Sequence, residues 1–301
     1  MKGETAVLKT QQSFSDDKQG KLYLIPTPIG NLEDITFRAI RLLKEADIIA
    51  AEDTRNTKKL CNYFEITTPI VSYHEHNKET SGKKMVERLH RGEQVALVSD
   101  AGMPCISDPG FELVQAVLEA DIPVVPLPGA NAALTSLIAS GLIPQPFYYY
   151  GFLSRGKKEK REELDFLATI PATFVLYESP HRLKETLREM VNHIGPSRKM
   201  VISRELTKKF EEFIRGTIQE GLDWSEANDL RGEFCLVIEG ASAENWQQEE
   251  TYWWEQLSIL QHVETYIEQK GLTSKEAIKE AAKDRSISKR DVYQAYHVEE
   301  E

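Results

Sequence analysis

Short runs of consecutive apolar residues alternate along the chain with stretches in which apolar residues recur every three or four positions. A run of the first kind predicts a strand buried on both faces, and the second pattern predicts an amphipathic helix. In the first half of the chain the expected strands are Lys21–Pro26, Asp47–Ala51, Val71–Tyr73, Val95–Ser99 and Val124–Pro126. The expected helices are Thr36–Ala46, Gly82–Arg91, Phe111–Ala120 and Ala130–Ser140. This alternation predicts an α/β domain built on a largely parallel sheet.

A second α/β series is expected after the aromatic run Phe147–Tyr150 and a basic loop at Arg155–Arg161. Its predicted strands are Phe174–Tyr177, Lys199–Ser203, Phe210–Ile214 and Glu233–Glu239, and its predicted helices are His181–His193 and Thr217–Leu222. Beyond Gly240 the sequence becomes polar. Helices are then predicted at Trp253–Lys270, after an N-cap at Ser274, and at Lys289–His297.

These patterns divide the chain into four expected parts. They are a disordered leader (1–19), an N-terminal α/β domain (20–135), a C-terminal α/β domain (136–242) and a helical tail (243–301). The short helices of the tail are similar to a helix-turn-helix module, and a plain helical appendage fits the pattern equally well. A ligand cleft is expected between the two α/β domains, because hinge regions commonly hold such clefts.

Length and composition exclude several classes of protein. With 301 residues and 41% hydrophobic content, the chain can bury two cores of ordinary size. It has neither the apolar run of roughly 18–20 residues that a membrane span needs nor a secretory signal. The cysteines Cys61, Cys105 and Cys235 show neither metal-binding nor disulfide spacing. We therefore expect a cytoplasmic protein without a metal site.

The net charge of −11 argues mildly against a nucleic-acid partner. Residues 241–301 hold 13 acidic and 7 basic residues and carry −6, which leaves −5 for residues 1–240. Any contact with RNA must therefore come from local basic patches. The candidates are Arg55, Lys58, Lys59, Arg155, Lys157, Lys158, Lys160 and Arg161. Taken alone, such charge runs are more often solvated surface.

Four loops rich in glycine and proline follow predicted strands or begin predicted helices. They are Thr27–Leu32, Ser99–Pro104, Ser107–Gly110 and Pro128–Ala132. Ligands of open α/β sheets bind at the carboxyl ends of the strands, and helix N-termini offer N–H groups to carboxylates. The loops contain the Asp100 carboxylate and no Lys or Arg, and the chain lacks both G-x-G and the P-loop motif. A zwitterionic or cationic ligand such as S-adenosylmethionine therefore suits them better than a polyphosphate.

Several longer strings carry a specific resemblance. They are LYLIPTPIGNLEDITFRAI, AEDTR, VSDAGMPCISDPG, PLPGANAAL, YESPHRL and SREL, in this order from about Lys21 to Gly240. The chain resembles the tetrapyrrole-methylase superfamily and, within it, the ribosomal RNA small subunit methyltransferase I family. The segment Ser99-Asp100-Ala101 departs from the Gly-Asp-Pro typical of the tetrapyrrole branch and matches the ribosomal branch.

The resemblance implies a two-lobed class III methyltransferase fold, a homodimer, and S-adenosylmethionine in the cleft between the lobes. It also implies 2′-O-methylation of a cytidine ribose in the decoding region of 16S rRNA in the small ribosomal subunit. The cofactor contacts carried over from the family are Pro28, Gly30, Asp100, Ala101, Gly102, Met103, Ser107, Asn131, Ala132, Ala133, Leu153, Ser203 and Leu206. Asp100 is alternatively a turn or N-cap residue, and Met103 is alternatively an ordinary core residue.

Methyl transfer to a hydroxyl is an in-line displacement at the sulfonium carbon, so positioning supplies much of the rate. A ribose hydroxyl is a poor nucleophile and requires a general base. We expect the catalytic residues to include Asp53, Glu178 and Arg182, with one carboxylate taking the proton and an arginine holding RNA phosphate. A purely structural Glu178–Arg182 pair at i,i+4 spacing is the alternative.

Two other functions remain open at this stage. A small-molecule methyltransferase of the tetrapyrrole type has the same fold and needs a closed pocket without a basic rim. A non-catalytic ribosome-binding protein keeps the fold and transfers no methyl group. A helix-turn-helix regulator built on the tail is disfavoured, because the tail is short and acidic.

Overall fold

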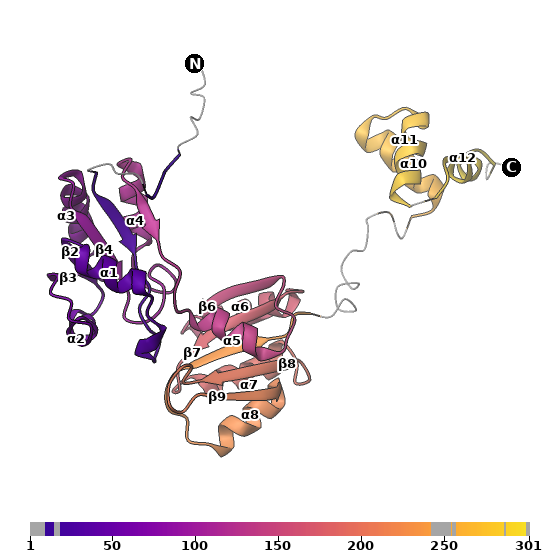
Figure 1. Ribbon diagram of the computed structural model, residues 1–301. Coiled ribbons are helices and arrows are strands. Elements are labelled where there is room, and N and C mark those ends of the chain that lie inside the picture. Colours follow the sequence, from indigo (N-terminus) through magenta and orange to yellow (C-terminus); the bar gives the residue numbers. More distant parts are fainter. Residues whose placement is uncertain (1–9, 15–18, 242–253, 255–256, 286, 299–301) are drawn as a thin grey trace. The chain divides into compact units, whose positions relative to one another are not determined.

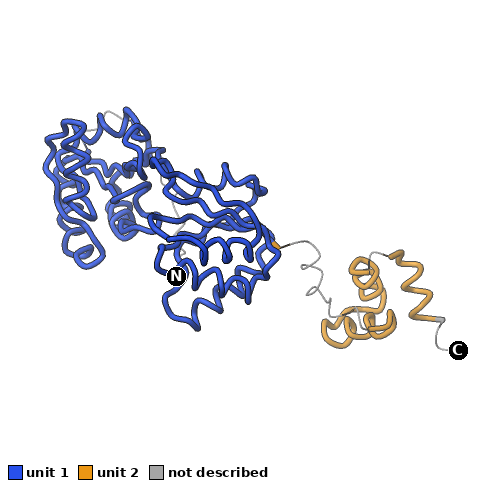
Figure 2. The backbone as a smooth tube through the Cα atoms, turned by 90° about the horizontal axis from the view of Figure 1, so that it is seen from below, with its two compact units in different colours: residues 1–240 blue, residues 241–301 orange. Residues whose placement is uncertain are grey.

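The computed structural model describes residues 10–14, 19–241, 254, 257–285 and 287–298 (Figure 1). The chain divides into two compact units, Met1–Gly240 and Ala241–Glu301 (Figure 2). The first unit contains two five-stranded sheets, each the centre of one lobe. We call residues 20–130 the first lobe and residues 131–240 the second lobe.

The first lobe is a parallel sheet in the order β3-β2-β4-β1-β5. Its strands are β1 (Lys21–Leu24), β2 (Ile48–Ala51), β3 (Ile70–Ser72), β4 (Gln94–Val98) and β5 (Val124–Pro126). Its helices are η1 (Leu32–Asp34), α1 (Phe37–Glu45), α2 (Thr54–Tyr63), α3 (Lys78–His90) and α4 (Phe111–Glu119). The predicted parallel α/β arrangement is confirmed.

Both faces of this sheet are buried under helices. Because side chains alternate along a strand, Ile49 packs with residues of α1 and α2, and its neighbour Ile48 packs with residues of α3 and α4. The sequence pattern failed to predict α2. That helix is polar and buries only Thr57 and Cys61, so it lacks an apolar stripe.

The second lobe is a mixed sheet in the order β6-β7-β10-β8-β9. Its strands are β6 (Phe147–Phe152), β7 (Thr173–Glu178), β8 (Lys199–Arg204), β9 (Glu212–Thr217) and β10 (Phe234–Ile238). Only β6 and β7 pair in parallel, and β10, β8 and β9 pair antiparallel with their neighbours. The second sheet is therefore mostly antiparallel, whereas the first is entirely parallel.

Helices cover both faces of the second sheet. They are α5 (Ala132–Ser140), α6 (Lys157–Thr169), α7 (Leu183–His193) and α8 (Ile218–Ala227). Helices α6, α7 and α8 share one apolar cluster with the sheet, and α5 packs on the other face against Val175 and Val237. The expected domain boundary at residue 135 falls inside α5, which belongs to the second sheet.

The stretch expected to be a basic loop is mostly helical, which corrects the prediction. Helix α6 begins at Lys157, and Leu164 and Leu167 form its buried face. Charged residues fill its first two turns, so the apolar period starts too late to predict the helix. Lys160 is 2% exposed and its ammonium lies 3.7 Å from Glu185, so it is not the surface residue that we expected.

Part of the expected disordered leader, residues 1–9 and 15–18, lies outside the described residues. The described part packs on the first lobe, unlike a disordered leader. The Gln11 side-chain amide accepts from Val124 N–H (2.9 Å) and donates to Val124 O (2.8 Å) at the edge strand β5. The Arg38 guanidinium lies 5.2 Å from the centre of the Phe14 ring.

The second unit contains α10 (Ile259–Lys270), α11 (Ser274–Asp284) and α12 (Lys289–Val298). Its core includes Val263, Ala277 and Ala281. Helix α10 begins later than predicted, after the N-cap Ser258, and the cap of α11 is Thr273 rather than Ser274. Within the described residues of the whole chain, no helix has the length and apolar character needed to span a bilayer.

Candidate active site

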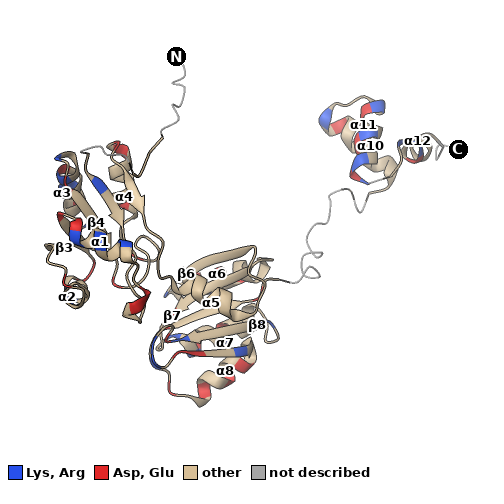
Figure 3. Ribbon diagram, viewed as in Figure 1, with Lys and Arg blue, Asp and Glu red and all other residues tan. Residues whose placement is uncertain are grey.

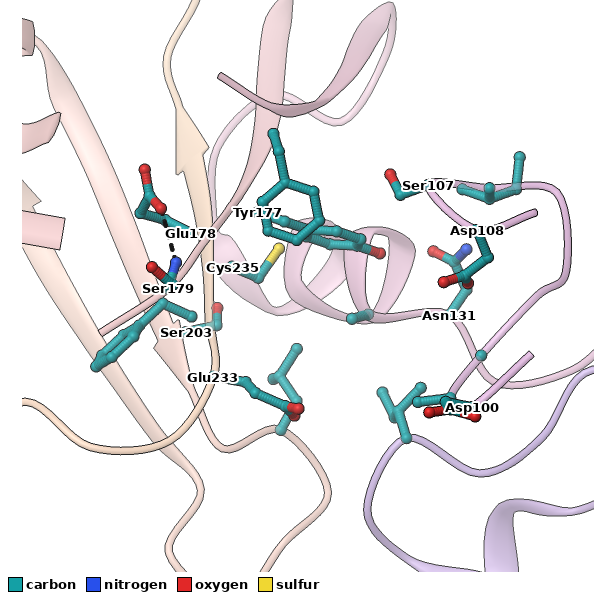
Figure 4. Close-up of a pocket in the computed structure, with 18 of the residues that line it drawn as sticks. Asp100, Ser107, Asp108, Asn131, Tyr177, Glu178, Ser179, Ser203, Glu233 and Cys235 are labelled. Carbon is teal, nitrogen blue, oxygen red and sulfur yellow. Dashed lines mark hydrogen bonds between the residues drawn. The ribbon is translucent and has the colours of Figure 1, made fainter. Parts of the chain in front are cut away.

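A cleft of about 350 Å³ lies between the two lobes of the first unit, within the size range of small-molecule sites. It is formed by the segment between β4 and α4, the start of α5, and the ends of β7, β8 and β10 that face it (Figure 4). Most of the predicted cofactor residues line this cleft. They are Asp100, Ala101, Gly102, Met103, Ser107, Asn131, Ala132, Ser203 and Leu206.

The remaining predicted cofactor residues, Pro28, Gly30, Ala133 and Leu153, are not among the lining residues. Their chain neighbours Ile29, Ala132 and Phe152 are lining residues instead. The backbone N–H of Ala133 donates to the Tyr177 hydroxyl at 3.1 Å. Ala133 thus holds a side chain of the cleft wall, and Pro28, Gly30 and Leu153 lie next to lining residues in the chain.

Gly30 lies where the two lobes touch. A Cβ at this position would stand 2.4 Å from Lys208 Cγ and 2.8 Å from Thr207 Oγ1. The next residue, Asn31, donates its backbone N–H to Thr207 Oγ1 at 3.1 Å. The loop after β1 therefore packs on the β8–β9 connection, and only glycine allows that close approach.

The loop after β4 is held by a reciprocal pair of backbone hydrogen bonds between Thr27 and Gly102, each 2.9 Å long. Gly102 has φ of +79°, a conformation that favours glycine. Asp100 accepts hydrogen bonds from Asp53 N–H and from the Asn56 side-chain amide, both at 3.0 Å. This loop is thus fixed to the start of α2 and to the loop after β1 while its other side faces the cleft.

Aromatic side chains of the second lobe form another wall. The Tyr177 ring packs edge to face with Tyr149 (5.3 Å between centres) and with Phe152 (5.6 Å). The Tyr149 hydroxyl lies 2.7 Å from Ser107 Oγ and so joins the two lobes. Burial raises the pKa of both Tyr149 and Tyr177, so both phenols are neutral near pH 7.

The cleft is anionic in composition. Of the described residues that line it, Asp100, Asp108, Glu178 and Glu233 are acidic and none is Lys, Arg or His. Burial, followed by the neighbouring Glu52 and Asp100 carboxylates, raises the pKa of Asp108 to about 7, while a hydrogen bond from Ser99 acts in the opposite direction. Such a cleft attracts a cation and repels a polyphosphate.

Glu178 and Arg182 form the i,i+4 pair that was the structural alternative. Glu178 lies at the cleft, with its side chain 1% exposed and Oε1 3.5 Å from Arg182 Nε. Ser179 N–H donates to Oε1 and Thr186 Oγ1 donates to Oε2, both at 2.7 Å. Arg182 Nη2 donates to the Leu153 carbonyl at 2.8 Å. Both side chains thus fix the turns beside the cleft.

Asp53 lies outside the set of lining residues and caps α2. Its carboxylate accepts from the backbone N–H of Arg55 and pairs with the Arg55 guanidinium at 2.6 Å. The hydrogen bonds from the Arg55 side chain and backbone lower the pKa of Asp53 to about 2. A carboxylate of such low basicity is poorly suited to accept a proton from a hydroxyl.

Comparison with known proteins identifies the family. The family model for "Tetrapyrrole (Corrin/Porphyrin) Methylases" matches residues 21–221. The ribosomal RNA small subunit methyltransferase I of Bacillus subtilis (strain 168) is 59% identical over 98% of this chain and 100% of that protein. The chain belongs to the ribosomal RNA small subunit methyltransferase I family. A Synechocystis protein of the same name is 45% identical over 91% of this chain and 96% of its own.

Several solved structures share the fold of this family member. A cobalt precorrin-4 methyltransferase superposes with a TM-score of 0.57 at 21% identity, over 73% of this chain and 94% of its own. A diphthine synthase gives 0.57 at 12% identity, over 76% and 93%. Uroporphyrin-III C-methyltransferase from Thermus thermophilus, solved with S-adenyl homocysteine, gives 0.52 at 21% identity, over 73% and 97%. The predicted two-lobed fold is confirmed.

Most of the basic residues predicted to contact RNA remain on the surface of this family member. Exposed ones are Arg55, Lys58, Lys59, Arg155, Lys157, Lys158 and Arg161, and Lys160 is buried. Arg161 is paired with Glu189 at 2.9 Å. Lys and Arg are mixed with Asp and Glu over the helices rather than gathered in one field (Figure 3).

Several residues of the site were not among those predicted from the sequence. Ile29, Ile106, Asp108, Phe152, Tyr177, Phe234 and Cys235 also line the cleft. Asp108 lies inside one of the loops that the sequence singled out, and its place just before Pro109 and Gly110 at the start of a helix was a usable signal. The aromatic lining residues could not be predicted in this way, because aromatic residues are common in buried strands whether or not a site is near.

Proposed function

We propose that the protein transfers a methyl group from S-adenosylmethionine to the ribose 2′-hydroxyl of a cytidine in the decoding region of 16S rRNA. The names of the relatives support methylation of small-subunit ribosomal RNA. The choice of nucleotide and of the 2′-oxygen rests on the family resemblance of the sequence. That resemblance also leads us to expect a homodimer that acts on the small ribosomal subunit in the cytoplasm.

The anionic cleft is the observation that carries the choice of methyl donor. S-adenosylmethionine supplies a methyl group that its sulfonium charge has already activated. The acidic side chains Asp100 and Asp108 face the cleft and favour such a cation. The described lining contains no Lys or Arg that would compete with the sulfonium cation for these carboxylates.

The start of α5 fits the amino-acid end of the same ligand. Asn131 caps this nine-residue helix by accepting from Leu134 N–H at 2.9 Å, and Asn131 and Ala132 line the cleft. A helix N-terminus of this kind favours a carboxylate. The apolar lining residues Ile29, Met103 and Leu206 suit the less polar parts of the ligand.

For RNA, we propose contacts at the exposed basic residues of α2 and at the start of α6. The first group is Arg55, Lys58 and Lys59, and the second is Arg155, Lys157 and Lys158, with the paired Arg161 beside it. Contacts of this kind bind phosphate without reading sequence. Methylation of subunits is therefore expected to weaken as the salt concentration rises.

The test is methylation of unmodified small ribosomal subunits by the full-length protein with radiolabelled S-adenosylmethionine, followed by nuclease mapping. Label on one ribose of 16S rRNA supports the proposal. Label on a base would refute the 2′-oxygen as the methyl acceptor. Label on another RNA would refute 16S rRNA as the substrate. Tight cofactor binding without transfer to RNA favours a small-molecule methyltransferase or a non-catalytic ribosome-binding protein.

A further inference from the structure

Of the four acidic residues in the described lining of the cleft, three are already held by partners. Glu178 is fixed by the hydrogen bonds and the ion pair of the β7–α7 turn. Asp100 accepts two hydrogen bonds of 3.0 Å from the start of α2. Glu233 is 76% exposed and pairs with Lys208 Nζ at 2.8 Å. Glu178 and Asp100 are therefore held by hydrogen bonds within the protein, and Glu233 is too exposed to be shielded from water.

Asp108 differs from these three. The Ser99 hydroxyl, which donates to the Gly102 carbonyl at 3.2 Å, is near enough to lower its pKa, and its charged neighbours are the carboxylates of Glu52 and Asp100. Its side chain reaches from the loop before α4 toward Asn131, at the start of α5 (Figure 4). A half-buried carboxyl group without a cationic partner is more basic than a paired one, because its negative charge is poorly compensated.

We propose that Asp108 is the general base that accepts the proton of the ribose 2′-hydroxyl during methyl transfer. The role needs a carboxyl group that faces the cleft, keeps an oxygen available and is shielded from bulk water. Asp108 meets these conditions, and the predicted candidates Asp53 and Glu178 fail one or more of them. This inference rests on the proposed function.

The proposed step is a direct displacement at the methyl carbon with transfer of one proton. The 2′-oxygen forms a bond to the methyl carbon while the bond from that carbon to sulfur breaks, and the electron pair of that bond stays on sulfur. The hydroxyl proton passes to the carboxylate of Asp108. The products are a 2′-methyl ether, a neutral thioether and protonated Asp108, which returns its proton to water when the products leave.

The protonation state of the groups around Asp108 sets the expected pH dependence. Burial raises the pKa of Glu52, and the Asp100 and Asp53 carboxylates add to that rise. Burial also raises the pKa of the Cys105 thiol to about 11 and the pKa of Tyr149, so both stay neutral. Asp108 itself has a pKa of about 7 and is protonated at lower pH. Transfer should therefore rise with pH and level off above about 7.

The experiment compares the wild-type protein with Asp108→Asn and Asp108→Glu in single-turnover methylation of small subunits, at saturating S-adenosylmethionine and across acid to mildly alkaline pH. Asp108→Asn keeps the size of the side chain and should lower the rate roughly 10²–10⁴-fold and remove its rise with pH. Asp108→Glu should keep the rise at a lower plateau. The matched control is Asp229→Asn, an exposed carboxylate outside the lining, which should leave rate and profile unchanged.

Two readouts do not depend on activity. S-adenosylhomocysteine lacks the sulfonium charge that Asp108 favours, so its calorimetric affinity should be nearly the same for wild-type protein and Asp108→Asn. Carbon NMR of carboxyl-labelled aspartate should show one group that titrates near pH 7 in the wild type and is missing in Asp108→Asn. A binding defect that fully accounts for the lost activity would overturn the role of base, as would a wild-type rate and profile in Asp108→Asn. If the wild type leaves every ribose unlabelled, the proposed function fails and this role fails with it.

Discussion

Replacing Glu178 by Gln distinguishes a structural carboxylate from a reacting one. Its Oε1 accepts from Ser179 N–H and its Oε2 from Thr186 Oγ1, both at 2.7 Å, and Arg182 Nε lies 3.5 Å from Oε1. Gln keeps the size and one carbonyl oxygen but loses the charge. Its amide nitrogen is a donor where the second carboxylate oxygen was an acceptor.

The size of the effect follows from which partners can adapt. A hydrogen bond to a charged group contributes about 1.5–3 kcal/mol. The Thr186 hydroxyl can rotate and accept from the new amide, and Arg182 keeps its bonds to the Leu153 and Ser154 carbonyls. We therefore expect a loss of about 2 kcal/mol in the free energy of unfolding, equivalent to roughly 4–8 °C for a body of this size.

Calorimetry gives the unfolding temperature, and single-turnover methylation well below that temperature gives the rate. We expect Glu178→Gln to unfold earlier and to transfer the methyl group at the wild-type rate. Thr186→Val is the matched structural control, because it removes one of the same hydrogen bonds and leaves the carboxylate charged. A large fall in rate with an unchanged unfolding temperature, seen in Glu178→Gln and absent in Thr186→Val, would refute a structural role.

Two further changes test the RNA surface and the cofactor loop. Replacing Lys157 and Lys158 with Glu should weaken methylation of subunits and flatten its salt dependence while leaving calorimetric affinity for S-adenosylhomocysteine unchanged. The same change at the exposed residues Lys83 and Lys84 is the control, and equal loss in both variants would rule out a specific surface. Gly102→Ala forces a side chain into a backbone with φ of +79° and should cost about 1–2 kcal/mol in stability. Cofactor affinity should fall with it, whereas unchanged affinity would show that this loop does not hold the ligand.

Hydrophobic patterning was sufficient for elements with a continuous apolar signal. The central strands β2 and β4 of the first sheet are almost wholly buried, and the sequence places all five strands of this sheet within a residue or two of their observed bounds. Pattern failed for helices α2 and α6, whose first turns are polar or charged. In both cases tertiary packing of a few residues stabilises a helix that the local sequence pattern does not predict.

The site was predictable where one loop carries several of its residues. The segment Asp100–Met103 and the start of α5 come from such loops, and the parallel sheet brings them to one edge. The second lobe contributes its residues through antiparallel pairing, in which β10 lies between β7 and β8. Residues such as Cys235 reach the cleft only through this order, which no local pattern contains.

The net charge of −11 can be reconciled with an RNA substrate if the two ligands use different parts of the first unit. The cleft presents Asp100 and Asp108 to a cationic methyl donor, and phosphate groups are repelled from it. Exposed cations lie instead on α2 and at the start of α6. The carboxylates of the cleft would then also affect the RNA, because they repel phosphate groups and do not repel an uncharged ribose hydroxyl. Specificity for a ribose would thus follow partly from the same carboxylates that favour the donor.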